Sequence, residues 1–119
     1  MIRFINCIKK RDDISIENFR NYWQSQEFED LLHSVIDITK AQRFTKNLTL
    51  DVEANVMIQE ERGGGEPFDG IIEYWWDKGS ELMDLYDTDE AKRVRQQMID
   101  CQRQFIDLAA SSAFFTESQ

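Results

Sequence analysis

The sequence predicts one α+β domain of the ferredoxin-like class, in which a βαββαβ order of elements forms a four-stranded antiparallel sheet with its helices on one face. Two observations carry this prediction. Four short segments rich in β-branched and aromatic residues alternate with segments whose apolar residues recur every three or four positions. The 119 residues also contain one proline and no linker or low-complexity run, so we expect a single domain over residues 1–119.

The N-terminal part predicts a strand, a broken helix and a second strand. Residues 2–9 are dense in β-branched and aromatic types, which favour a strand. Ser15 is a suitable N-cap for the helix that follows. The apolar spacing in that helix changes from three and four to five between Trp23 and Phe28, so we expect a break there. Residues 40–50 alternate weakly between apolar and polar and predict the second strand.

The central part adds a short helix and the strongest strand signal. We expect a helix over residues 51–62 that ends at the glycines of residues 63–65. These glycines are not expected to bind phosphate, because no Gly-Lys-Ser/Thr sequence follows them. The turn-forming residues 67–70 (Pro-Phe-Asp-Gly) lead into a strand at residues 71–76 (Ile-Ile-Glu-Tyr-Trp-Trp).

The C-terminal part predicts two helices and the closing strand. Ser80 is a candidate cap for a short helix that extends to Tyr86. Thr88 then caps the clearest helix of the sequence, whose continuous apolar stripe consists of Ala91, Val94, Met98, Cys101, Phe105 and Leu108. Residues 113–116 (Ala-Phe-Phe-Thr) predict the last strand before a polar tail.

Both faces of the predicted sheet carry large apolar groups. Alternate residues of the third strand point to opposite faces, Ile72, Tyr74 and Trp76 to one and Ile71, Glu73 and Trp75 to the other. The helices of one small domain cover only one of these faces. We therefore expect a homodimer in which two sheets pack face to face around a barrel-like interior. Trp75 is assigned to the face that meets the partner, with Trp76 as the alternative.

Charge and cysteine content argue against several functions. Fourteen basic and 23 acidic side chains give a net charge of −9, which repels phosphate backbones and anionic lipids. The sequence has no basic leader and no run of 18 apolar residues, so we expect a cytoplasmic protein that binds neither nucleic acid nor membrane. Cys7 and Cys101 are too few and too far apart for a disulfide framework or a zinc ribbon, and we expect buried free thiols.

The candidate ligand-contacting residues come from neighbouring strands and the first helix. A pocket between the sheet and this helix is expected to be lined by Asn6, Tyr22, Trp23, Phe44, Tyr74 and Trp76. Ordinary core packing is the alternative for the aromatic members. Asn6 is the strongest candidate for a ligand contact, because it is polar in an otherwise apolar strand.

The remaining candidates concern ions and protons. His33 is the only histidine, so the sequence offers no His-based metal site, and we expect neither a metal nor a cofactor. Arg3 and Arg43 lie on strands that neighbour the strand of Glu73 in this topology. An Arg–Glu pair inside the sheet sandwich is therefore expected, with a structural role in fixing the dimer as the alternative to a ligand contact.

Three motifs of this sequence resemble the EthD-domain family. Residues 19–23 (Phe-Arg-Asn-Tyr-Trp) are similar to the first-helix signature of the family, and residues 67–76 are similar to its Asp-Gly strand. Residues 105–114 are similar to its C-terminal helix and strand. The resemblance covers nearly the whole chain and implies the dimeric α+β barrel superfamily. EthD members include a protein tied to ethyl tert-butyl ether degradation and fungal enzymes that dehydrate, cyclise or decarboxylate polyketides.

One departure from the family pattern concerns the site. Family members commonly carry a histidine within a His-Ala-Pro stretch four residues beyond the Tyr-Trp pair, and this sequence has Glu27 there. Either Glu27 replaces that histidine, or His33 reaches the site from further along the helix, or the chemistry is absent. The resemblance therefore does not carry over a His-dependent mechanism.

Together, the residues and the resemblance predict an EthD-like protein that binds a small apolar, aromatic or polyketide-like molecule, with cofactor-free lyase or cyclase activity such as dehydration or decarboxylation. Tyr22, Glu27 and His33 are the proton-transfer candidates, while Asn6 and Arg43 would polarise a carbonyl group.

Two other functions remain open at this point. A cofactor-free monooxygenase of the same superfamily is suggested by Asn6 on the first strand and by Trp75 or Trp76 on the third. A non-catalytic binding or assembly module is the other, in which the aromatic groups and the Arg–Glu pair are purely structural.

Overall fold

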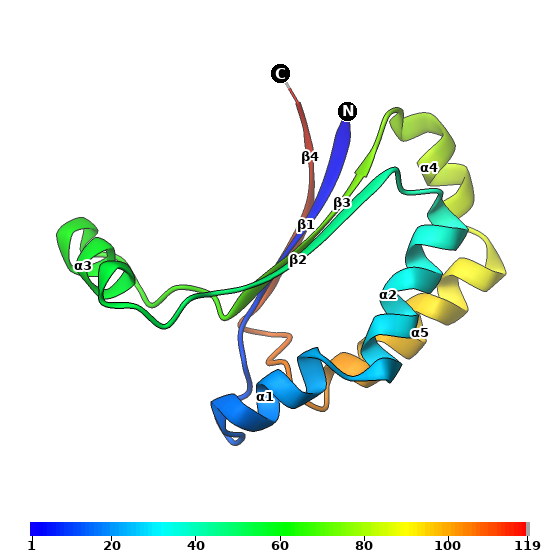
Figure 1. Ribbon diagram of the computed structural model, residues 1–119. Coiled ribbons are helices and arrows are strands. Elements are labelled where there is room, and N and C mark those ends of the chain that lie inside the picture. The colour runs from blue at the N-terminus through cyan, green and yellow to red at the C-terminus, as the bar shows by residue number, and fades with distance from the viewer. Residues whose placement is uncertain (119) are drawn as a thin grey trace.

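The computed structural model describes residues 1–118 and has the ferredoxin-like fold predicted from the sequence (Figure 1). Its elements, in chain order, are β1 (Ile2–Ile8), α1 (Ile16–Trp23), α2 (Gln26–Thr39), β2 (Arg43–Leu48), α3 (Glu53–Arg62), β3 (Gly70–Trp76), α4 (Gly79–Tyr86), α5 (Asp89–Gln102) and β4 (Ser112–Glu117). The four strands form one antiparallel sheet in the order β2-β3-β1-β4.

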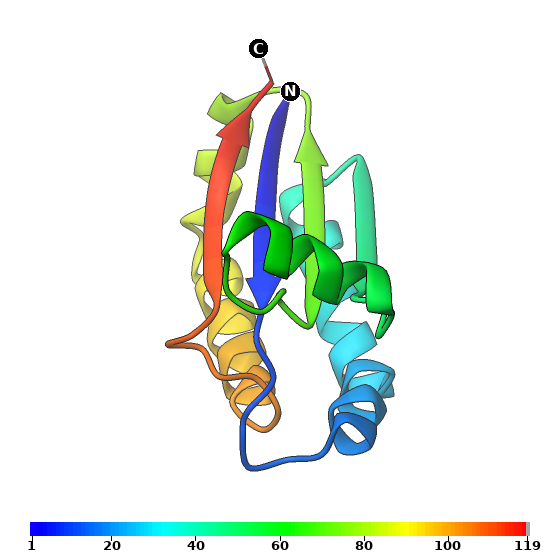
Figure 2. The ribbon, with the colours of Figure 1, turned by 90° about the vertical axis from the view of Figure 1, so that its left-hand side faces the viewer.

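The sheet separates the helices into two unequal groups. Figure 1 shows α1, α2, α4 and α5 on one side of the sheet and α3 standing away from the other side. Figure 2 views that second side, where β1, β3 and β4 are in plain view apart from the part that α3 crosses. We call this second side the open face. None of the described helices is long and apolar enough to cross a membrane.

Side-chain caps set the starts of three helices on the covered side. The hydroxyl of Ser15 accepts a hydrogen bond from the Asn18 amide at 3.0 Å, and that of Ser25 accepts from the Phe28 amide at 3.3 Å. Ser25 therefore starts a new helix where the apolar spacing changes, and the predicted break is confirmed. The Thr88 hydroxyl caps α5 in the same way.

The structure corrects the predicted ends of two helices. Ser80 does not cap α4, which begins one residue before it without a side-chain cap. The apolar stripe of α5 continues to Leu108, but the helix ends at Gln102. Beyond it, the carbonyl of Phe105 accepts a hydrogen bond from the Arg11 amide, and Ile106 forms a bridge with Lys10. These contacts join the segment after α5 to the segment after β1.

The core lies between the sheet and α1, α2 and α5. Its most deeply buried side chains are those of Ile8, Phe28, Leu32, Ile72 and Phe105. On β3, the residues that alternate with Trp75 are buried, namely Ile72, Tyr74 and Trp76. Trp75 accordingly points to the open face, as predicted.

Gly70 provides a stability test, because it lies directly against Trp23. A Cβ atom at Gly70 would be 2.6 Å from Cη2 of Trp23, although Gly70 does not have a positive φ. We expect Gly70→Val to lower the free energy of unfolding by about 1–3 kcal/mol, because the buried indole ring has to move. Urea denaturation measures this change. Gly64→Val is the matched control, since a Cβ at Gly64 meets nothing within 4 Å; equal losses in both variants would contradict the steric explanation.

Candidate functional site

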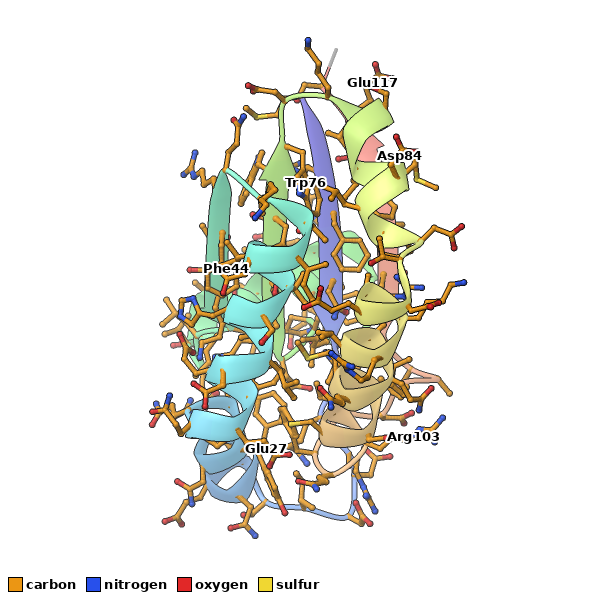
Figure 3. The ribbon with its side chains drawn as sticks, turned by 90° about the vertical axis from the view of Figure 1, so that its right-hand side faces the viewer. Glu27, Phe44, Trp76, Asp84, Arg103 and Glu117 are labelled. Atoms are coloured by element: carbon orange, nitrogen blue, oxygen red, sulfur yellow. The ribbon has the colours of Figure 1, made fainter. Side chains whose placement is uncertain are left out.

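A cavity of about 360 Å³ lies between the covered face of the sheet and the helices α2 and α5, with the end of α4 at one side. Figure 3 shows α2 and α5 side by side over the sheet. The walls are mostly apolar, with Phe4 and Phe115 from the sheet, Val35 from α2, and Met98 and Ile99 from α5. An apolar cavity of this size suits a small organic molecule.

Tyr74 and Trp76 line this cavity. The pocket expected from the sequence lay between the sheet and the first helix, whereas no residue of α1 lines this cavity. The polar atoms of Tyr74 and Trp76 are already engaged. The Trp76 indole donates a hydrogen bond to the Thr39 carbonyl at 2.9 Å, and the Tyr74 hydroxyl donates to the Leu32 carbonyl at 3.3 Å. Burial raises the pKa of Tyr74 above its usual value, and the negative charge of Glu29 adds to this effect. Tyr74 is therefore a neutral wall residue at physiological pH.

Two side-chain amides supply polar atoms to the cavity. Asn6 enters it from β1 and Gln102 from the last turn of α5. Gln102 is only 7% exposed, and neither side-chain amide forms a hydrogen bond with another described residue. No described polar side-chain atom is fully buried without a hydrogen-bond partner, so the Gln102 amide keeps some accessible surface, and Gln102 lines the cavity. Both amides are thus free to bind a carbonyl or hydroxyl group.

One charged side chain, that of Arg95, also lines the cavity. The guanidinium Cζ lies 3.9 Å from the centre of the Tyr86 ring, and Nη1 donates a hydrogen bond to the Tyr86 carbonyl. Sequence reasoning missed both Arg95 and Gln102. The spacing along α5 could have indicated both residues. One face of this helix carries residues three and four positions apart, namely Arg95, Met98, Ile99 and Gln102.

Three of the predicted site residues lie outside this cavity, where α1 ends and α2 begins. They are Tyr22, Trp23 and Glu27. The Tyr22 ring stacks on Phe105 with 5.2 Å between ring centres, and Trp23 is buried against Gly70. Glu27 is exposed near the start of α2, far from Trp76 (Figure 3). The structure therefore does not bring the predicted proton-transfer pair Tyr22 and Glu27 together with Asn6.

His33, Arg43 and Phe44 lie toward the β2 edge of the sheet and also outside the cavity. The His33 ring is exposed, with Nε2 3.2 Å from Glu29 Oε1, and it lies beside Phe44. Glu29 is also bound by Lys46, whose Nζ lies 2.7 Å from Oε2. This hydrogen bond lowers the pKa of Glu29 below its usual value. No group of three metal-ligating side chains occurs within residues 1–118.

The open face carries the expected Arg–Glu pair. Arg3 Nη1 lies 3.9 Å from Glu73 Oε1. Arg43 does not share this carboxylate; its guanidinium lies 5.0 Å from the centre of the Trp75 ring, with Arg3 at 5.7 Å from the same ring centre. The Thr45 hydroxyl donates a further hydrogen bond to Glu73 at 3.3 Å. Two cations thus hold Trp75 in place on the open face.

Both cysteines are free thiols, as predicted. Cys101 is buried, and burial raises its pKa to about 11. Cys7 is only half-buried. On the open face, burial and the nearby negative charge of Glu73 raise the pKa of Cys7. Thiols with raised pKa values are poor nucleophiles at neutral pH, so neither cysteine is a catalytic candidate.

A ferredoxin-like sheet with an apolar cavity beneath its helices defines a class of small α+β proteins rather than one protein. The EthD domain matches residues 11–109, and the chain belongs to the EthD family. No curated protein matches the sequence.

Solved structures of low sequence identity share the fold over almost their whole length. An ethyl tert-butyl ether degradation (EthD) family protein from Bacillus halodurans has a TM-score of 0.64 and 13% identity, with 100% of this chain and 99% of that chain covered. A dimeric protein of unknown function from Bacteroides fragilis has a TM-score of 0.61 and 12% identity, with 98% and 95% covered. The hydroxynitrile lyase of Passiflora edulis has a TM-score of 0.56 and 8% identity, with 99% and 94% covered.

Proposed function

We propose that this EthD-family protein binds a small, largely apolar, aromatic molecule in the cavity between the sheet and the helices α2 and α5. The observation that carries the proposal is the combination of an apolar cavity with the free amides of Asn6 and Gln102. Apolar walls supply affinity, and a few polar groups fix the orientation of a ligand. The aromatic side chains Tyr74 and Trp76 favour a flat ligand.

A cofactor-free lyase or cyclase activity is the catalytic form of this proposal. One structural neighbour is named a hydroxynitrile lyase, and the amides of Asn6 and Gln102 could polarise a carbonyl group of a ligand in the cavity. No described carboxylate or imidazole lines the cavity, so Tyr22, Glu27 and His33 would have to act from outside it. The geometry therefore supports binding more strongly than proton transfer. For the monooxygenase alternative, the two residues on which it rests, Asn6 and Trp76, both line the cavity.

We also propose that a second copy of the chain covers the open face. Ile71 and Phe114 on this face are exposed, and α3 has no buried residue while it stands on the same side. Apolar area of this kind marks an interface. The neighbours from Bacteroides fragilis and Thermobifida fusca are described as dimeric.

Blocking the cavity tests the binding proposal. Ala113, an exposed residue of β4, is part of the lining, and Ala113→Trp places a large ring at the cavity. We expect isothermal titration calorimetry with 6-hydroxy-2-naphthamide to show one site per chain in the wild type and binding at least about tenfold weaker in Ala113→Trp. Ala109→Trp is the control, because Ala109 is exposed and outside the lining. Equal affinity in all three proteins would contradict a ligand site in this cavity.

A further inference from the structure

We propose that Arg95 is an anion anchor and that the natural ligand is an aromatic molecule with one acidic group, such as a carboxylate. The inference rests on the proposed function, because it assigns the charge of the ligand in the same cavity. It goes beyond that proposal by naming the chemical class of the ligand and the residue that selects it.

Arg95 is held in position before any ligand arrives. Its side chain is half-buried, its guanidinium packs on the Tyr86 ring at 3.9 Å, and one N–H is bound by the Tyr86 carbonyl. The Tyr86 ring in turn contacts Phe115, which also lines the cavity. A guanidinium fixed in this way loses little conformational freedom when it binds an anion.

The charge of Arg95 has no counterpart in the described part of the chain. The salt bridges of the described residues involve Arg3, Lys9, Arg11, Lys46 and Lys92, and Arg95 shares the lack of a carboxylate partner with most of the other basic residues. Arg95 differs from them because it lines the apolar cavity. The cavity walls beside it are largely apolar and contain no described carboxylate. Apolar walls beside a half-buried guanidinium strengthen its attraction for an anion, because the local dielectric constant is lower than that of water. A ligand carboxylate would bind it through two parallel N–H···O hydrogen bonds.

The two side-chain amides of the cavity lie away from Arg95. Gln102 follows it by seven residues on α5, which corresponds to about 10 Å along the helix axis. Both α5 and β1 run away from the end of the sheet that holds the termini (Figures 1 and 2), so Asn6, near the end of β1, lies toward the same far end as Gln102. The arrangement fits a ligand with an acid at one end, an apolar ring system in the middle, and a neutral carbonyl or hydroxyl at the other end.

A pair of nearly isosteric compounds tests the charge requirement. We expect calorimetry to show that the full chain binds 6-hydroxy-2-naphthoate at least about tenfold more tightly than 6-hydroxy-2-naphthamide. Arg95→Met should remove this preference and leave the affinity for the amide within about threefold of the wild-type value. Arg95→Lys keeps the charge and should retain part of the preference. Where Arg95→Met does not fold by circular dichroism, Arg95→Gln provides the same comparison.

Lys92→Met is the matched control for the change in net charge. Lys92 lies on the same helix, its exposed side chain pairs with Asp87, and it is outside the cavity lining. This variant should keep the wild-type preference for the acid. Equal binding of both compounds by the wild type, or a preference that survives Arg95→Met, overturns the anchor role and leaves the cavity proposal standing. If neither compound binds, both proposals are wrong.

Discussion

Trp75→Lys is expected to convert the protein from a dimer into a monomer at micromolar concentration. Trp75 lies on the open face between Arg3 and Arg43, and lysine there would place a third positive charge beside them. If a second copy covers this face, that charge has to be desolvated among like charges, and the lost indole removes a large apolar contact. We expect the dissociation constant of the dimer to rise by at least about 100-fold.

Sedimentation velocity measures this change directly. The wild type should sediment as about twice the 14.1 kDa chain mass, and Trp75→Lys as a single chain. Met83→Lys is the matched control, because Met83 is exposed on α4 on the covered side of the sheet. A monomeric wild type, or a Trp75→Lys variant that stays dimeric, would contradict the proposed interface.

Phe105→Ala is expected to cause the largest loss of stability. Phe105 is fully buried, and its ring contacts those of Phe19, Tyr22 and Phe28, which belong to α1 and α2. Removing it leaves a cavity where the segment after α5 meets these helices. We expect a loss of about 3–5 kcal/mol in the free energy of unfolding, which is a large part of the about 5–15 kcal/mol that stabilises a typical domain.

Urea denaturation followed by circular dichroism checks this value. Where Phe105→Ala does not fold, Phe105→Leu should still lose about 1 kcal/mol. Leu50→Ala is the control, because Leu50 is strongly exposed and should change stability by less than about 0.5 kcal/mol. A loss below 1 kcal/mol for Phe105→Ala would show that the ring cluster is not the centre of the core.

The architecture could be predicted because the strand and helix signals are local. The spacing of apolar residues changes between Trp23 and Phe28, and Ser25 lies between them. This was sufficient to predict the break between α1 and α2. Alternation along β3 showed that Trp75 and Trp76 point to opposite faces, but which of them faces the helices is decided by the burial of Trp76 in the structure. The end of α5 could not be predicted, because Phe105 continues the apolar stripe while its carbonyl bonds to Arg11, a residue distant in sequence.

The cavity could be predicted only where a strand sets the direction of a side chain. Asn6, Tyr74 and Trp76 lie on strands and line the cavity, whereas Phe44, which was expected with them and also lies on a strand, does not. Tyr22 was grouped with them, but the rotation of α1 turns its ring onto Phe105 instead. Arg95 was missed because a charged residue on an amphipathic helix normally belongs to the solvent face. Its inward position depends on the packing of Tyr86, which the helical period does not reveal.

Locating a bound compound tests the central claim, namely that the space between the sheet and the helices α2 and α5 is the ligand site. Nuclear Overhauser contacts between 6-hydroxy-2-naphthamide and the methyl groups of the protein provide this location. We expect contacts with Val35, Met98 and Ile99, which line the cavity. Contacts with Ile5 and Ile71 on the strands of the open face instead, or with the surface hollow beside Ile106, would contradict it.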